Sequence, residues 1–530
     1  MTTSTLHTSL TRRIIQSAGI VMASVLLSRI LGFVREWTVA HEFGSNAVTD
    51  AYYAAFTLPD FLNYLVAGAF LSLTFIPVLS RCIAENREED GWRVFSTVTT
   101  FMGIALAGLV IVGEIFAPQL ATAIAPGFRA SEKEHVVFLT RLMLPAQLFF
   151  YEGGILSAVQ YAKGQFVVPS LAPLIYNAAI ILGGVLLAAR MGITGFAVGV
   201  LVGSLSGNFL LQVYGARRAG ARYLPNLHIR HPDFRFFVKL TIPIMLAFSI
   251  VFTDDWIIRF FGSYLVPASI TWLSYAKNLM RVPLGVVGQA VGVAAFPFLA
   301  QLYSEKRFEE LNRTLNATLK GIMLILLPIS ALTIAESRPL VYMVFSHTRL
   351  RPPDLDATAA TLGFFSLSMF AWGAQNILAR GFYAARDTLT PAVSGTIMTA
   401  LNLPMYWFLC RHLQYLGLAL ASSLGVIAYT AVLFVLLNRR IHNAESTALL
   451  VFLAKMGVAS TLGALACHEA ASLLEARIAW QSTHGAFLVL LGATAPGIVL
   501  TGLGAKLLGV RELSIYIRRF MPRLRPSPEV

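Results

Sequence analysis

Apolar residues occur along this chain in long runs, separated by short stretches rich in glycine, proline and charged residues. A helix that crosses a bilayer needs about 20 mainly apolar residues, and the runs match about 14 such helices. The pattern therefore predicts an all-α integral membrane protein. The helices are expected near 14–40, 47–80, 94–117, 135–161, 166–189, 193–216, 236–263, 267–303, 313–335, 357–384, 388–410, 415–438, 446–472 and 485–509.

Composition agrees with this pattern. Of the 530 residues, 56% are hydrophobic and 13% are charged, with a mean hydropathy of +0.68. A soluble domain carries about 25% charged residues, so little length is left for one here. The three cysteines, Cys82, Cys410 and Cys467, show neither metal-ligand spacing nor a disulfide framework. We expect no cleavable signal peptide, because no small-residue cleavage site follows the first apolar run.

Positive charge dominates the predicted loops. The net charge of +14 comes from 41 Lys and Arg against 27 Asp and Glu. In loops this charge orients helices and meets anionic headgroups, so membrane lipids rather than nucleic acid are the expected partners. Strongly basic loops alternate with loops that hold fewer cations, and the positive-inside rule then places both termini of this multi-pass protein in the cytoplasm. We expect a monomer.

The chain also repeats itself. Tyr161-Ala162 and Pro169 return as Tyr383-Ala384 and Pro391, 222 positions later, and Gly68 and Pro77 return as Gly288 and Pro297, 220 positions later. Long-range repeats of this kind are typical of transporters, which hold the substrate at the interface of the repeats. We predict two pseudo-symmetric six-helix lobes, 1–220 and 221–442, followed by two further helices in 443–510 and a basic cytoplasmic tail, 511–530.

Ionisable residues lie within or beside the first predicted helices. An ionisable side chain at bilayer depth costs roughly 3 kcal/mol or more unless it faces a water-filled cavity or a partner. Arg29 and Arg35 therefore suggest a polar interior, although Arg35 can also snorkel to the interface at a helix end. Asp50 is either an ion partner for these arginines or a helix N-cap. Asn63 lies deeper in the second predicted helix.

The eighth predicted helix, 267–303, is the repeat counterpart of the second and also carries cations. Lys277 and Arg281 are four positions apart and share a helix face, with Asn278 beside them. An excess of cations within the membrane suggests an anionic substrate, such as a phosphate or carboxylate headgroup. Asp254 is a candidate coupling-ion ligand, whereas Asp255 could neutralise Arg259 four positions later, and Asp387 is interpreted as a turn residue. Three carboxylates near predicted helix ends are interpreted as interfacial: Glu114, Glu152 and Glu336.

No enzyme motif accompanies these charges. The chain has no Walker-type phosphate loop and no His/Cys metal cluster, so neither ATP nor a metal cofactor is expected. The sequence leaves Na⁺ and the membrane potential as alternatives for the driving force. This pattern predicts a transporter rather than an enzyme.

Several stretches resemble the MurJ (MviN) family of lipid II flippases, within the multidrug/oligosaccharidyl-lipid/polysaccharide transporter superfamily. They are Ser28-Arg-Ile-Leu-Gly-Phe-Val-Arg35, Thr49-Asp-Ala-Tyr-Tyr53, Ala69-Phe70 with Phe75-Ile-Pro-Val78, and Arg380-Gly-Phe-Tyr-Ala-Ala-Arg-Asp-Thr-Leu-Thr-Pro391. The resemblance extends over nearly the whole chain, including the two trailing helices.

This resemblance implies a flippase that moves an undecaprenyl-pyrophosphate-linked peptidoglycan precursor, lipid II, from the inner to the outer leaflet. Arg29, Arg35 and Asp50 match family positions at a cationic central cavity. The two trailing helices would form a groove for the polyprenyl tail. Asp255 and Asp387 fall near positions that resemble a sodium site in some members.

The chain departs from the family pattern at two places. Asn63 and Tyr64 stand where the family has an arginine pair, and Asn278 stands at the arginine of the eighth helix, flanked by Lys277 and Arg281. The alternatives are therefore a flippase for another polyprenyl-pyrophosphate-linked oligosaccharide, an ion-coupled multidrug exporter, or a non-transporting scaffold that binds its lipid.

Overall fold

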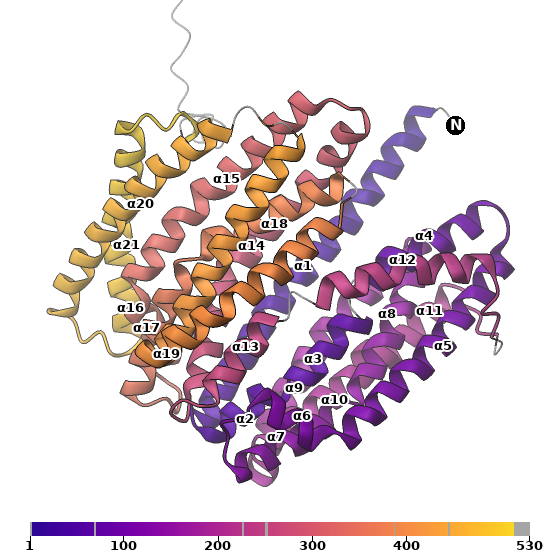
Figure 1. Ribbon diagram of the computed structural model, residues 1–530, viewed down its shortest axis with the longest axis horizontal. Helices are drawn as coiled ribbons and strands as arrows, with labels where there is room; N and C mark the ends of the chain where they lie inside the picture. The colour runs from indigo at the N-terminus through magenta and orange to yellow at the C-terminus, as the bar shows by residue number, and fades with distance from the viewer. Residues whose placement is uncertain are drawn as a thin grey trace, which may run out of the picture. The chain divides into compact units, whose positions relative to one another are not determined.

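The computed structural model describes residues 3–67, 70–224, 227–249, 253–385, 387–441, 443 and 446–513 (Figure 1). Every regular element within these ranges is a helix, which confirms the predicted all-α fold. Eight described helices or helix runs are long and apolar enough to cross a membrane, and a ninth is added if the pair 352–366 and 369–384, bent by 42°, forms one span. The count of about 14 spans stays a prediction.

Packing divides the chain into two compact units, 1–271 and 272–530. The helices of the first unit are α1 (Thr3–Phe43), α2 (Ala47–Ala55), α3 (Thr57–Leu62), the π-helix η1 (Asn63–Ala67), α4 (Phe70–Ala84), α5 (Glu88–Ile115), α6 (Ala117–Ile124), α7 (Ala130–Met143), α8 (Ala146–Ala162), α9 (Val167–Met191), α10 (Thr194–Gly203), the π-helix η2 (Ser204–Leu210), α11 (Leu211–Arg218), α12 (Pro232–Ser249) and α13 (Thr253–Gly262).

The second unit contains nearly all of α14 (Ser269–Ser304), whose first turn belongs to the first unit. It continues with α15 (Phe308–Ala335), α16 (Ser337–Phe345), α17 (Pro352–Ser366), α18 (Met369–Ala384), α19 (Leu389–Ile441), α20 (Ser446–Glu475) and α21 (Thr483–Leu507). The α19 element is two helices joined at Gln414, whose φ of 54° is not helical. Two separate helices were predicted there, 388–410 and 415–438.

The backbone repeats at the spacing seen in the sequence. The helices α5 and α15 have 28 residues each and begin 220 positions apart, at Glu88 and Phe308. Each follows a tight turn with a left-handed residue, Asn86 (φ 57°) or Lys306 (φ 58°). A left-handed lysine is sterically unfavourable, so the shared turn, and not the residue type, dictates this conformation. The two halves therefore fold through the same local geometry.

The packing boundary differs in position from the predicted lobe boundary at 220/221. The helices α12 and α13, which the repeat assigns to the second lobe, pack within the first unit, where Phe234 and Phe237 of α12 join the core formed by α4, α5 and α8. The second unit has its own core around α15, α18 and the end of α19, with Leu315, Phe382 and Leu437 at its centre. The division into lobes stays a prediction.

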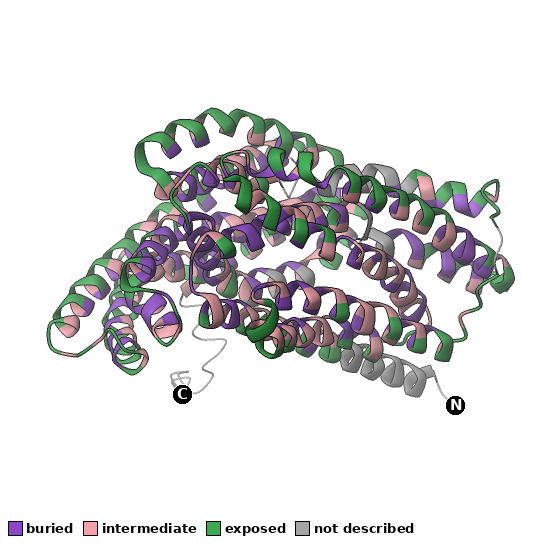
Figure 2. Ribbon diagram, turned by 90° about the horizontal axis from the view of Figure 1, so that it is seen from below, coloured by how far each residue is buried: buried purple, intermediate pink, exposed green. Residues whose placement is uncertain are grey.

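Many large apolar side chains are exposed, as expected for helices in contact with lipid. Exposed residues, green in Figure 2, run along one face of many helices, and Leu186, Leu401 and Leu507 are among them. The trailing helices α20 and α21 pack closely through small residues. A Cβ added to Gly463 would lie 2.6 Å from the Gly497 carbonyl oxygen. Such close approach is typical of helix pairs in membranes.

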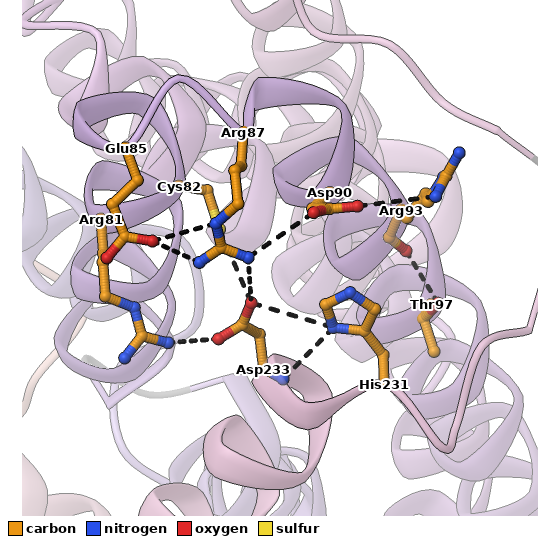
Figure 3. Close-up of polar contacts among 9 residues, drawn as sticks. All are labelled: Arg81, Cys82, Glu85, Arg87, Asp90, Arg93, Thr97, His231 and Asp233. Atoms are coloured by element: carbon orange, nitrogen blue, oxygen red, sulfur yellow. Dashed lines mark hydrogen bonds and ion pairs between the residues drawn. The ribbon is translucent and has the colours of Figure 1, made fainter.

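A cluster of charges also joins α12 to the first unit (Figure 3). Asp233, near the start of α12, pairs with Arg81 at the end of α4 and lies 3.6 Å from Arg87 Nη1 in the following turn. The His231 Nδ1 atom accepts a hydrogen bond from the Asp233 backbone N–H at 3.2 Å. The arginines are about half-exposed, so each pair contributes roughly 1 kcal/mol or less. The cluster therefore defines the position of α12 but contributes little to the free energy of unfolding.

Candidate functional site

Arg35 is held in a polar network inside the first unit. Its Nη2 donates to Glu36 Oε1 at 2.7 Å, and its Nη1 lies 3.5 Å from Asn177 Oδ1 on α9. Glu36 is buried and also accepts a hydrogen bond of 2.6 Å from the Tyr53 hydroxyl. Arg35 itself keeps 25% of its side-chain surface exposed. A fixed guanidinium with an open edge is suited to binding a phosphate or carboxylate.

Asp50 has a different environment from that of a headgroup ligand. It is buried in α2, and its Oδ2 accepts the Ala268 backbone N–H at 2.7 Å. Its Oδ1 accepts both the backbone N–H (2.8 Å) and the hydroxyl (2.6 Å) of Thr271 in the first turn of α14. Negative charge at a helix start satisfies unpaired N–H groups and complements the helix dipole. Asp50 therefore positions the start of α14.

The second predicted helix is broken into α2, α3, η1 and α4, and Asn63 is the first residue of the π-helical stretch. Short π-helical segments in α-helices are frequent at functional sites. Nearly two turns earlier, Thr57 accepts a hydrogen bond of 2.8 Å from Arg259 Nη1, and Arg259 Nη2 lies 3.9 Å from Asp60 Oδ2. Arg259 comes from α13, so the sequence of the broken helix did not reveal this cation.

The remaining candidates in the first unit lie on α1 and α13. Arg29 is exposed on α1, two turns before Arg35. Asp254 and Asp255 occupy the first turn of α13, where acidic residues complement the helix dipole. This gives both aspartates a structural role that does not require an ion. Within the described residues, no group of three His, Cys, Asp or Glu side chains could hold a metal.

In the second unit, Lys277 is buried, with 5% of its surface exposed. Its Nζ lies 5.8 Å from the centroid of the Phe365 ring, a cation–π distance. Asn278 is partly buried and Arg281 is exposed on the same helix, α14. Exposure therefore increases along these three side chains, from the buried ammonium of Lys277 to the exposed guanidinium of Arg281.

Asp387 caps a helix. It accepts the backbone N–H of Thr390 at 2.9 Å and its hydroxyl at 2.7 Å, and it pairs with Arg440. Burial alone would raise the pKa of the Asp387 carboxyl, but these hydrogen bonds and Arg440 lower that pKa below its ordinary value. The carboxylate is occupied at the turn before α19, so we do not retain it as a candidate ion ligand.

Each unit thus carries cations on apolar helices, at Arg29, Arg35 and Arg259 in the first unit and at Lys277 and Arg281 in the second. A sequence profile for the lipid II flippase MurJ matches residues 39–489 of the chain. The chain belongs to the lipid II flippase MurJ family. The match begins near the end of α1, after Arg29 and Arg35, and extends through α20 to the first residues of α21.

Curated relatives agree with this family. The chain is 28% identical to the probable lipid II flippase MurJ of Buchnera aphidicola subsp. Acyrthosiphon pisum, over 81% of this chain and 84% of that protein. It is 27% identical to the lipid II flippase MurJ of Burkholderia cenocepacia, over 84% of this chain and 88% of that protein. Family membership and the apolar helices make the chain a multi-pass protein of the bacterial inner membrane.

Solved structures share the fold. A lipid II flippase MurJ in an inward closed conformation superposes with a TM-score of 0.76 at 22% identity, and the match covers 94% of this chain and 99% of that one. An inward-facing MATE family multidrug transporter of the MOP superfamily gives a TM-score of 0.64 at 16% identity, covering 79% of this chain and 96% of that one. The MurJ family member described here thus has the fold of that superfamily.

Proposed function

We propose that this protein moves lipid II from the inner to the outer leaflet of the cytoplasmic membrane by alternating access. The observation that carries the proposal is the match to the MurJ family over residues 39–489, in a chain whose apolar helices hold cations. The headgroup of lipid II is a pyrophosphate-linked glycopeptide, and an anion of this kind requires fixed positive charge to leave water.

In this proposal Arg29, Arg35, Lys277 and Arg281 bind the pyrophosphate. The fixed orientation of Arg35, set by Glu36 and Asn177, supports its part. Lys277 is a point charge on a flexible stem, suited to neutralise an oxygen atom rather than to fork around it. Asn63 and Asn278 contribute hydrogen bonds where the family pattern has arginines.

The polyprenyl tail stays in lipid beside α20 and α21. Exposed apolar side chains on these helices, such as Leu465 and Leu488, support this placement. Each methylene kept out of water contributes about 0.8 kcal/mol, so a long tail would not follow the headgroup through a polar path.

The membrane potential is the driving force that we favour. Moving one charge through 100 mV changes the free energy by about 2.3 kcal/mol, which is enough to return a cationic site after release of an anionic substrate. Na⁺ coupling through Asp254 or Asp255 is the alternative. The protein would work as a monomer.

A second candidate substrate is another polyprenyl-pyrophosphate-linked oligosaccharide. The departures at Asn63 and Asn278 favour it, because they change the number of guanidinium groups available to the headgroup. Complementation separates the two substrates. Cells depleted of their own lipid II flippase grow if this protein carries lipid II, and they lyse if it carries only another glycan.

Proteoliposomes test the cation site directly. The accessibility of the lipid II headgroup at the outer surface is measured with time for the native protein, Arg29→Ala and Arg35→Ala. Because a hydrogen bond to a charged group contributes roughly 1.5–3 kcal/mol, each variant should flip about 10- to 100-fold more slowly. The control is Arg217→Ala, at an exposed arginine in the last turn of α11. Full activity of both cavity variants would refute the cationic site.

A further inference from the structure

Glu152 of α8 lies deep within the first unit and not at an interface. A Cβ added to Gly103 of α5 would lie 2.8 Å from Glu152 Oε1, so the carboxyl packs directly against that glycine. Gly103 lies in the middle of α5, about 22 Å from its first residue and about 18 Å from its last. The hydrocarbon core is about 30 Å thick, so this level is close to its centre. The interfacial interpretation of Glu152 is therefore wrong.

The helix that carries Glu152 is an interior helix. From Ala146 to Ala162 every residue of α8 is buried or partly buried, and none is exposed. The helix packs against α4, α5 and α11 and against both π-helical segments, η1 and η2. Glu152 thus lies among protein side chains rather than along a lipid-facing helix, where it could snorkel to headgroups.

Glu152 has no hydrogen-bond or ion-pair partner among the described residues. Other polar atoms on the helices packed against α8 are also unpaired there: the Thr99 Oγ1 atom of α5, one turn from Gly103, and the Asn208 Nδ2 atom of η2. The Asn208 backbone carbonyl lies against Gly153, since a Cβ there would fall 1.7 Å from it. Unsatisfied buried polar atoms of this kind are sites where a water molecule can bind.

The charged and titratable groups of the surrounding elements are engaged elsewhere or far away. Arg93 and Glu114 of α5 are ten and eleven positions from Gly103, about 15 Å along the helix. The other such groups on packed elements have their own contacts: Asp60 with Arg259, Arg81 and Cys82 with Asp233, Arg218 with Tyr214, Tyr176 with Phe150, Tyr151 with the Val98 carbonyl and Tyr161 with Phe166. The set is completed by Tyr64 on η1, Arg190 at the end of α9, Tyr214 and Arg217 on α11, and Glu88, Glu89 and Asp90 in the first turn of α5, thirteen or more positions from Gly103.

We propose that Glu152 is a reversible proton-binding site inside the first unit, and that flipping requires it to be both protonated and deprotonated in each cycle. An isolated carboxylate at this depth is costly, and protonation removes the charge. The neighbouring π-helical segments interrupt the α-helical hydrogen-bond pattern, and such interruptions are frequent at functional sites. Proton binding at Glu152 would therefore bias the packing of α8 against η1 and η2. This coupling rests on the flippase function proposed above.

Two measurements on the full-length protein test the proposal. Infrared difference spectra of the protein without lipid II, between about pH 5.5 and 8.5, should show a titrating carboxyl band that is missing in Glu152→Gln. Flipping in proteoliposomes at equal pH on both sides should follow a bell-shaped profile, with limbs of up to about tenfold per pH unit for one proton. Glu152→Gln should abolish flipping at every pH, and Glu152→Asp should restore it with a shifted profile.

The matched control is Glu114→Gln, in a carboxylate of α5 that lies 3.9 Å from Arg141 near the helix end. It should keep the native profile. A folded Glu152→Gln protein with native flipping and an unchanged pH profile overturns the proposal, and so does the absence of a titrating band. If the native protein flips no lipid II, the proposed function fails, whereas the infrared titration still decides whether Glu152 binds a proton.

Discussion

The second and eighth predicted helices are copies of one another in the repeat, yet their backbones differ. In the first copy a turn at Phe56 separates α2 from α3, and π-helical hydrogen bonding begins at Asn63, whereas the second copy is the continuous helix α14 of 36 residues. Asn63 and Pro283, the proline inside α14, are 220 positions apart. The same place in the repeat thus carries a π-helical turn in one copy and a residue without a backbone N–H in the other.

The two copies also differ in where their charge comes from. In α14 the cations belong to the helix itself, at Lys277 and Arg281. The position of Lys277 corresponds to Thr57 in the first copy, and Thr57 is contacted by Arg259 from α13. The first copy therefore receives from a neighbouring helix the charge that its own sequence lacks. A missing residue in a motif does not mean a missing charge in the folded protein.

The largest expected effect is on the flipping rate, when the cation of either copy is removed. Arg259→Ala and Lys277→Ala should each slow flipping about 10- to 100-fold, because each removes a cation from a low-dielectric setting. Arg259→Lys should retain part of the activity, since it keeps the charge and loses the fork geometry. The measurement is headgroup accessibility in proteoliposomes. If Arg259→Ala flips at the native rate while Lys277→Ala does not, the charge of the two copies is not equivalent.

A smaller effect is expected at Asp50, which holds the start of α14. Asp50→Asn loses the charge at three hydrogen bonds, so the free energy of unfolding should fall by roughly 1–3 kcal/mol. Thermal unfolding in detergent measures this, with Asp90→Asn in the first turn of α5 as the control. Flipping should fall as well, because the first turn of α14 loses its anchor. An unchanged melting temperature would argue against an anchoring role.

The smallest effect concerns Asp387 in the second unit. Because its folded-state pKa is lowered, its contribution is fully present above the ordinary pKa of about 3.9 and is lost as the pH falls through the folded value. The native protein should therefore lose stability below about pH 4, and Asp387→Asn should flatten this acid limb while reducing stability at neutral pH by about 1 kcal/mol. Unfolding curves at a series of pH values check this. Identical acid limbs in both proteins would show that other carboxylates govern it.

The sequence by itself determined the parts of this protein that depend on periodicity and composition. Runs of apolar residues define the helices because the backbone must satisfy its own hydrogen bonds in lipid. The constant spacing between Tyr161 and Tyr383 showed the repeat, which the matching turns at Asn86 and Lys306 now display in the backbone. The cations Arg35 and Lys277 stood out because charge is rare in such runs.

Only the tertiary structure decided what those charges touch and how deep each one lies. The contacts of Asp50 with Thr271 and of Arg259 with Thr57 join residues more than 200 positions apart. No local pattern encodes such pairs, because they depend on which helix faces are brought together. The depth of Glu152 follows from its contact with Gly103 on a neighbouring helix, and not from its distance to a helix end. Depth in a bundle is a property of neighbouring helices, so a single helix cannot specify it.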